Sequence, residues 1–201
     1  IGVFDPSSAF SLNISSWNTA KVTNMRNMFQ GAIAFNENIG NWNTSAVTNM
    51  STMFASARVF NQNIGNWNTS SVTNMQSMFH GARAFNQPIG YWNTSSVTNM
   101  QSTFDSADVF NQDIGNWNVS AVTKTEGMFY GTIFNQDISN WNTASITNFN
   151  YMFKSAQFNR NIGQWNTSNA TSMAGMFNNN SAFNQNISSW CVGNISSLPA
   201  D

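Results

Sequence analysis

The amino-acid sequence predicts a single right-handed α/β solenoid of about eight strand–helix units, each 24 or 25 residues long. Two observations lead to this fold class. The first is the even spacing of the Trp residues, and the second is the return of the same residue types at fixed offsets around each of them. We expect residues 1–201 to form one repeat domain. The eight Trp are Trp17, Trp42, Trp67, Trp92, Trp117, Trp141, Trp165 and Trp190.

The first half of each unit has the pattern of a short strand. In the unit of Trp67, alternate residues Phe60, Gln62 and Ile64 would lie on one face, as a period of two requires. Gly65 and Asn66 follow, and both residue types favour a turn. We therefore predict one strand ending before each Trp.

The second half of each unit has the pattern of a short amphipathic helix. Its apolar residues fall at offsets of 0, 3, 6, 7 and 10, which form one stripe of a 3.6-residue helix. Thr and Ser at 69–71 can accept hydrogen bonds at a helix start. Two to three turns are marginal alone, so stacking on neighbouring units must stabilise the helix. The stripe consists of Val72, Met75, Met78, Phe79 and Ala82.

A strand and a helix in about 25 residues give a leucine-rich-repeat-like geometry, with parallel strands about 4.8 Å apart. The last unit changes after Trp190, where no Met-Phe pair follows and Pro199 interrupts regular structure. Because terminal repeats need an atypical outer face, we predict a C-terminal cap at 190–201.

The composition excludes several classes of function. Charged residues make up only 7%, and seven Lys and Arg against eight Asp and Glu give a net charge of −1. This offers neither a footprint for nucleic acid nor a polybasic membrane patch. No apolar run reaches the roughly 18 residues of a membrane span, and no disulfide can form within a chain whose single Cys is Cys191. Because the sequence opens within a unit, we expect a mature or partial product.

The unit resembles the repeat of BspA-like leucine-rich-repeat surface proteins, a group first recognised as a repeat family of unknown function. The residues that carry the resemblance are Phe-Asn-Gln-x-Ile-Gly-Asn-Trp-Asn-Thr-Ser-x-Val-Thr-Asn-Met-x-x-Met-Phe-x-x-Ala, which recur across about 8–198. The resemblance implies a secreted or surface-attached protein used in adhesion or interaction. It implies no catalytic residue.

The invariant columns have two interpretations each. The Trp column either packs in the core or forms an exposed stripe that stacks on sugars, and its Ile and Phe neighbours favour the core. A buried indole N–H would need an acceptor, which a carbonyl of an adjacent unit can supply. The Asn columns either satisfy the backbone of adjacent turns or present a regular surface to a glycan, a mineral or ice.

Few residues suggest covalent modification or catalysis. Most Asn-x-Ser/Thr sequons coincide with the repeat motif, and Asn179 and Asn194, in a loop and in the cap, are the better glycosylation candidates. His80 is the only His and belongs to a variable column, so we expect a solvated loop residue. Cys191 has no nearby His and is expected to be a buried cap thiol, with a cross-link to another chain as the alternative. We therefore predict no enzyme activity and no cofactor.

One stretch departs from the repeat by its acidity. It holds five of the eight acidic residues, opposed only by Lys124, and we predict an interaction surface there. Two of the five share a column one unit apart, which makes them a weak candidate for Ca²⁺, with a solvated acidic face or a partner contact as the alternative. The acidic residues are Asp105, Asp108, Asp113, Glu126 and Asp137, and the Ca²⁺ candidates are Asp113 and Asp137.

Together these observations predict a non-enzymatic binding or adhesion module for a protein or glycan ligand. The alternative is a structural accessory subunit that docks along a larger extracellular, lumenal or membrane-associated assembly. We expect an extracellular or cell-surface location for the first and the lumenal side of an organelle as the alternative.

Overall fold

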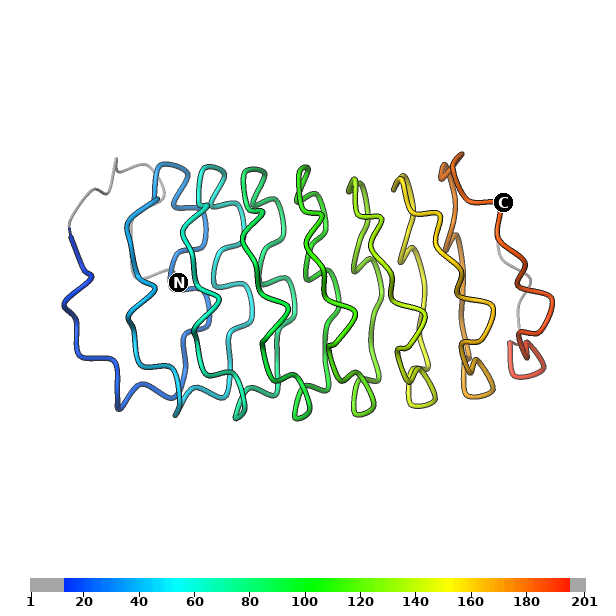
Figure 1. The fold of residues 1–201 in the computed structure, drawn as a ribbon, viewed down its shortest axis with the longest axis horizontal. Helices are drawn as coiled ribbons and strands as arrows, with labels where there is room; N and C mark the ends of the chain where they lie inside the picture. Colours follow the sequence, from blue (N-terminus) through cyan, green and yellow to red (C-terminus); the bar gives the residue numbers. More distant parts are fainter. Residues whose placement is uncertain (1–12, 196–201) are drawn as a thin grey trace.

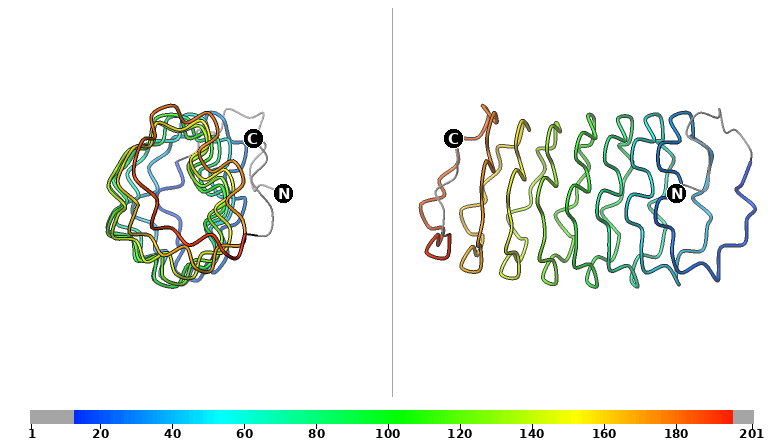
Figure 2. Two further views of the ribbon diagram at one scale, coloured as in Figure 1. Left: turned by 90° about the vertical axis from the view of Figure 1, so that its right-hand side faces the viewer. Right: turned by 180° about the vertical axis from the view of Figure 1, so that it is seen from behind.

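The chain winds into a stack of coils, and each repeat unit contributes one coil (Figures 1 and 2). The computed structural model describes residues 13–195. Seen along the stack, the coils superimpose into a flattened ring (Figure 2), so that a residue type recurring once per unit forms a column along one face. Columns of equivalent residues are therefore the natural unit in which to describe the molecule.

The predicted α/β architecture is wrong. Residues 13–195 contain no α-helix and no extended β-strand, and their only sheet-like pairing is a row of isolated parallel β-bridges. The bridged residue lies seven positions after each Trp, and every bridge joins one coil to the next. The bridged residues are Asn24, Asn49, Asn74, Asn99, Lys124, Asn148 and Ser172.

Each coil is a series of tight turns. In the segment predicted to be helical, the N–H of Met53 donates to the carbonyl of Met50, and that of Ala57 donates to Phe54. The same three-residue closure joins Thr44 to Val47. Core residues spaced by three are therefore the first and last residues of β-turns, which explains why their spacing imitates a helical stripe.

Four other backbone N–H groups of this segment, at Met50, Thr52, Phe54 and Ser56, donate to the next coil. Met50 donates to the carbonyl of Asn74, and Phe54 donates to Met78. An α-helix would instead direct each N–H to a carbonyl four residues earlier in the same segment. The backbone N–H groups donate either within a turn or to a neighbouring coil, so their hydrogen bonds are satisfied without a helix.

Positive φ angles also exclude a helix here. Thr52 and Ser56 adopt φ of 54° and 60°, in the left-handed region, at the third positions of the Met50–Met53 and Phe54–Ala57 turns. A positive φ at this position is the mark of a type II turn. Gly31, Gly81 and the equivalent Gly131 take up the same conformation in their coils.

An irregular segment replaces the predicted strand. Hydrogen bonds that involve side chains join this segment to the equivalent segment of the neighbouring coil. Phe60 and Ile64 are buried as the pattern requires. The Asn61 N–H, however, donates to Asn36 Oδ1, and Gln62 Nε2 donates to the Asn36 carbonyl. Asn and Gln side chains thus supply bonds that a β-ladder would supply from the backbone.

Stacked aromatic rings fill the interior. Phe54 lies 4.0 Å from Phe60 within one coil and 5.5 Å from Phe79 in the next, measured between ring centroids. The Trp column belongs to this core: Trp67 is 3% exposed, and its Nε1 donates to the Ile39 carbonyl of the preceding coil. The core interpretation is confirmed for the inner coils, whereas Trp17 is 45% exposed.

The regular polar columns serve the backbone. In the column that follows the core Phe, Asn61 Oδ1 accepts from the Asn86 N–H of the next coil. In the column that follows the Trp, Asn68 Oδ1 accepts from the Ser70 N–H, as in an Asx turn. Structural use of the Asn columns is therefore confirmed, although these side chains are exposed or half-buried rather than inside.

The described part of the predicted cap continues the stack. Trp190 is half-buried and donates from Nε1 to the Ile162 carbonyl, while Asn194 Nδ2 donates to Ser168. Residues 196–201 of the cap lie outside the described residues. Within 13–195, no helix is long and apolar enough to cross a membrane.

Candidate functional site

One face of the stack carries residues that differ from coil to coil. We call it the variable face, and it consists of the residues 9, 10 and 13 positions after each Trp, in the turns around the Met-Phe pair. Its first coils carry mainly Ser, Thr, Gln and Asn, whereas three later coils carry charged and aromatic groups. In those coils the face consists of Gln101, Ser102, Asp105, Glu126, Gly127, Tyr130, Asn150, Tyr151 and Lys154.

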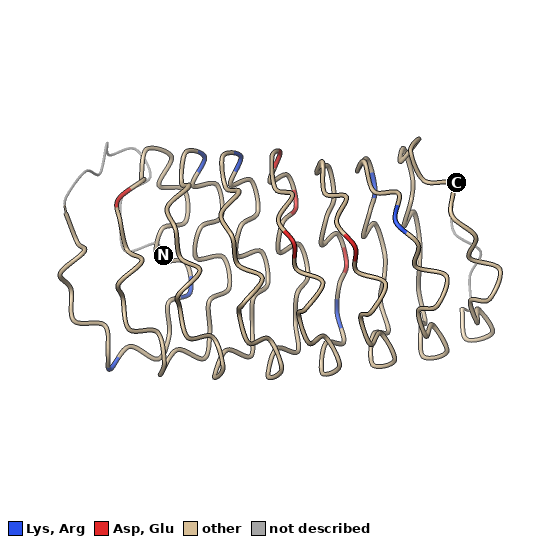
Figure 3. Cartoon of the chain, in the orientation of Figure 1, with Lys and Arg blue, Asp and Glu red and all other residues tan. Residues whose placement is uncertain are grey.

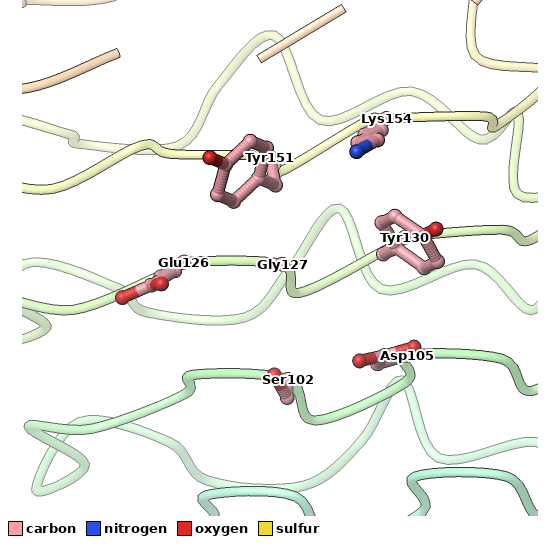
Figure 4. A pocket seen from close by; sticks show the side chains of 7 residues that line it. All are labelled: Ser102, Asp105, Glu126, Gly127, Tyr130, Tyr151 and Lys154. Atoms are coloured by element: carbon pink, nitrogen blue, oxygen red, sulfur yellow. The ribbon is translucent and has the colours of Figure 1, made fainter. Parts of the chain in front are cut away.

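A shallow pocket of about 240 Å³ lies on the variable face and spans three coils. Figure 4 shows six side chains arranged around the backbone of Gly127, with Glu126 on one side and Tyr130 on the other. The pocket is lined by Ser102, Asp105, Glu126, Gly127, Tyr130, Tyr151 and Lys154.

Gly127 opens the pocket. Its φ is +59°, and the equivalent residues of the preceding coils, Ser77 and Ser102, adopt φ of 53° and 52°. A Cβ added at Gly127 would lie 3.3 Å from Ser102 Oγ, so a side chain there would occupy the space between neighbouring coils. The missing side chain therefore produces a depression between Ser102 and Tyr151 in this column.

Tyr151 occupies the same column in a strained conformation. Its φ is 56°, although a bulky side chain is rarely found in the left-handed region. Gly175 in the next coil makes room for it, because a Cβ there would lie 2.8 Å from Tyr151 Cδ1 and Cε1. A strained residue held by its surroundings is a reason to suspect a functional role.

Lys154 lies against both tyrosines. Its Nζ is 5.0 Å from the ring centroid of Tyr151 and 5.6 Å from that of Tyr130. The negative ring faces attract the ammonium group and position it at the pocket edge. Neither ion pair found in residues 13–195 involves Lys154.

Glu126 is held on the opposite side by amides. Its Oε2 accepts from Asn148 Nδ2 at 3.2 Å and, at 3.5 Å, approaches Gln101 Nε2. The side chain is thus oriented by neutral amide donors at the edge of the pocket.

Asp105 pairs with the only His of the chain. His80 Nδ1 lies 3.3 Å from Asp105 Oδ2. The Asp105 side chain beside the ring raises the pKa of His80, partial burial lowers it, and the carboxylate charge raises it further. Because no hydrogen bond of good geometry reaches His80 Nδ1, the contact is an ion pair whenever His80 is protonated. His80 is therefore half-buried and paired, not the freely solvated residue expected from the sequence.

The other three acidic residues do not join the pocket. Asp108 is over half exposed and forms a 3.7 Å ion pair with Arg83. Asp113 and Asp137 each accept a backbone N–H two residues ahead, from Gly115 and Ser139, as Asn does in this column elsewhere. The structure thus brings together only two of the five predicted interaction residues, Asp105 and Glu126 (Figures 3 and 4).

The turn that contains Asp137 changes the pKa of its carboxyl group. Hydrogen bonds from the Ser139 backbone and side chain lower the pKa of Asp137, with a smaller contribution from the charge of Arg160. No group of three or more His, Cys, Asp or Glu that could hold a metal occurs in residues 13–195. Asp113 and Asp137 each serve as a turn acceptor, and a Ca²⁺ site between them stays a prediction.

The glycosylation candidates and the thiol lie away from this pocket. Asn179 and Asn194 are both exposed, and the Asn194 side chain is already bonded to Ser168. The prediction of a buried thiol is wrong, because Cys191 is a free, exposed cysteine. Its carbonyl accepts from Thr167 Oγ1.

Sequence reasoning missed Ser102, Gly127, Tyr130, Tyr151 and Lys154. The signal was present in the columns: Tyr151 stands where other units have Asn, Thr, Ser or Gly, and Tyr130 and Lys154 share a column with His80 and Asp105. Acidity alone selected the wrong partners because it ignored which offsets face the same side.

Comparison with known proteins places the chain in a family. The family model described as "Mycoplasma protein of unknown function, DUF285" matches residues 1–72, 60–157 and 104–200, which together span nearly the whole chain. The chain belongs to the DUF285 family. No curated protein and no solved structure matches the chain. The family supports a repeat protein, and its description assigns no function.

Proposed function

We propose that this DUF285 protein is a non-enzymatic binding module whose protein or glycan ligand contacts the variable face. The observation that carries the proposal is the pocket around Gly127, where side chains from three coils converge although the coils otherwise repeat. Tyrosines beside a few charged groups are typical of binding surfaces, because a Tyr ring offers large contact area with little entropy to lose.

The regular faces are poorer candidates because their polar groups are already engaged. Thr48 Oγ1 donates to the Thr23 carbonyl, and the same bond recurs from Thr73 through Thr171. On the Asn-Thr-Ser segment, the Ser70 hydroxyl and N–H both donate to Asn68 Oδ1. A ligand there would compete with the bonds that hold the coils together.

A binding role also suits the chemistry of the pocket better than catalysis does. His80 lies against Asp105 rather than beside a hydroxyl or thiol nucleophile. Cys191, the only thiol, belongs to the last described coil and is not among the pocket residues. The proposal includes membership of the BspA-like surface proteins and an extracellular or cell-surface location, with an organelle lumen as the alternative.

The test is affinity capture from the native source with a matched variant. The triple variant carries Tyr130→Gln, Tyr151→Ser and Lys154→Ala, which are residues that the same columns hold at Gln30, Ser102 and Ala55. We expect wild type to retain a specific protein or glycoconjugate that the triple variant loses at least tenfold. The control is Gln30→Ala on the same face, far from the pocket. Equal capture by wild type and triple variant would refute a ligand on this surface.

A ridge of exposed apolar side chains favours a second candidate, a structural accessory subunit. Each side chain lies in the loop just before a core Phe, and each is 39–47% exposed. Val59, Val109 and Ile133 hold the position directly before that Phe, which Ala84 occupies in the coil between the first two. Exposed apolar side chains that recur on one side of the stack suit docking against a larger assembly. Co-purification in fixed stoichiometry, lost in a Val59→Ser, Val109→Ser double variant but kept in the triple variant, would establish it. The ridge consists of Ile33, Val59, Val109 and Ile133.

A further inference from the structure

We infer that the pocket around Gly127 is a subsite for a single sugar ring. This inference rests on the proposed binding function and specifies its ligand chemistry. Three features of the described residues carry it: the size of the pocket, the distribution of donors and acceptors, and the retention of a strained Tyr151.

The size of the pocket suits one ring. Its volume of about 240 Å³ is below the roughly 300–1,000 Å³ of pockets that enclose drug-sized ligands. The floor is the backbone of Gly127, so a ring can approach the chain between Ser102 and Tyr151 (Figure 4). A longer glycan would continue along the coils, outside the depression.

Polar groups of opposite character flank this floor. Glu126 supplies the main acceptor, because Asp105 Oδ1 accepts from Ser106 Oγ and Asp105 Oδ2 lies against His80. Lys154 supplies donors, and the Tyr130 and Tyr151 hydroxyls can do either. A sugar hydroxyl both donates and accepts, so adjacent hydroxyls of one ring can satisfy both kinds of group. Aromatic side chains beside them can pack on the apolar C–H groups of the ring.

The charges of the pocket balance and thus disfavour a strongly charged ligand. Asp105 is paired with His80, which leaves Glu126 opposed by Lys154. A cationic side chain entering the pocket would meet Lys154, and an anionic one would meet Glu126. A neutral polyol avoids both penalties, which is why we prefer a sugar to a charged peptide.

Tyr151 supports a ligand site independently of the charges. Ser occupies the same column, with nearly the same φ, in the coils of Ser77 and Ser102. The stack therefore closes without a tyrosine at this position, and the strained ring is not needed for the fold. Its phenol lies in the pocket lining instead.

The test measures binding of methyl glycosides to the intact chain by ligand-observed NMR saturation transfer and titration. The panel includes neutral hexosides, an N-acetylhexosaminide and a uronic acid, with the dipeptides Gly-Glu and Gly-Lys as charged competitors. The variants are Gly127→Ser, which fills the floor, and Tyr151→Ser; both restore a residue that other coils carry in this column. Ser77→Gly is the control, because it removes a side chain of that column away from the pocket.

We expect at least one neutral glycoside to bind with a Kd on the order of 1 mM, as a ligand of about a dozen heavy atoms allows. Gly127→Ser and Tyr151→Ser should each weaken it at least tenfold, and Ser77→Gly should leave it unchanged. Absence of any glycoside binding, binding of the dipeptides alone, or binding indifferent to both variants would overturn the sugar subsite. If the triple variant still lost the ligand that wild type captures from the native source, the proposed binding function would stand and only the sugar subsite would be refuted.

Discussion

Replacing Trp92 with alanine removes a ring from the middle of the aromatic core. Trp92 is 3% exposed and stacks between Trp67 and Trp117, with centroids 6.4 and 6.3 Å away. Its Nε1 donates to the Ile64 carbonyl of the preceding coil. The substitution therefore affects packing with both neighbouring coils and one buried hydrogen bond.

We expect the free energy of unfolding to fall by about 3–5 kcal/mol, the usual cost of truncating a buried Trp. About 1 kcal/mol of this would come from the unsatisfied Ile64 carbonyl. Trp92→Phe separates the two contributions, because it keeps a ring in the stack and removes only the N–H donor and part of the volume.

Urea denaturation followed by far-ultraviolet circular dichroism measures the loss. Stability in a repeat array comes from coupling between neighbours, so a defect at the centre should also broaden the transition. Trp17→Ala is the matched control, because this residue stacks on Trp42 but is 45% exposed. We expect it to cost about 1 kcal/mol or less. A loss below about 1 kcal/mol for Trp92→Ala would refute the buried-ladder account.

Three further predictions follow from the site. Tyr151→Ser should leave stability unchanged or raise it by up to about 1 kcal/mol, because it relieves a bulky residue at positive φ; a clear drop in melting temperature would contradict the strain argument. Because the folded pKa of His80 is raised above 6.5, its pairing with Asp105 stabilises the fold below pH 6.5 and loses this effect as pH rises through the folded value. His80→Gln should thus destabilise more at pH 5.5 than at pH 8.5, by less than about 1 kcal/mol for so exposed a pair; an equal or reversed difference in urea midpoints would count against it. Asp113→Asn with Asp137→Asn should change stability by less than about 0.5 kcal/mol, because Asn makes the same turn in this column, and a melting temperature that responds to calcium in wild type alone would restore the cation site.

The false helix shows how a periodicity can mislead. Val72, Met75, Met78, Phe79 and Ala82 are all buried, as the stripe predicts, but consecutive β-turns rather than a helix produce their spacing. A turn places its first and last residues three apart, and a helix places residues three and four apart on one face. The distinguishing sign was the recurrence of Gly, Ser, Asn and Thr at the positions of Asn27 and Gly31, where the structure requires positive φ and where Tyr151 is the exception.

The candidate site was predictable only in part. The sequence drew attention to the stretch that contains Asp105 and Glu126, and both line the pocket. It could not exclude Asp113, because the separation along the chain does not reveal which side of a coil a residue occupies. Nor could it identify Gly127, whose contribution is the space left by a missing side chain.

The sequence alone determined the repeat, its register and the identity of the core columns, because a buried position restricts the residue type in every copy and the copies can be aligned without a structure. The tertiary structure decided the backbone conformation of each unit, which is a series of turns rather than a strand and a helix. Each turn is too short to be stable alone, and its backbone bonds are completed by the carbonyls of the next coil, as in the Met50–Asn74 and Phe54–Met78 pairs. It also decided the site, because the pocket exists only where three coils lie side by side.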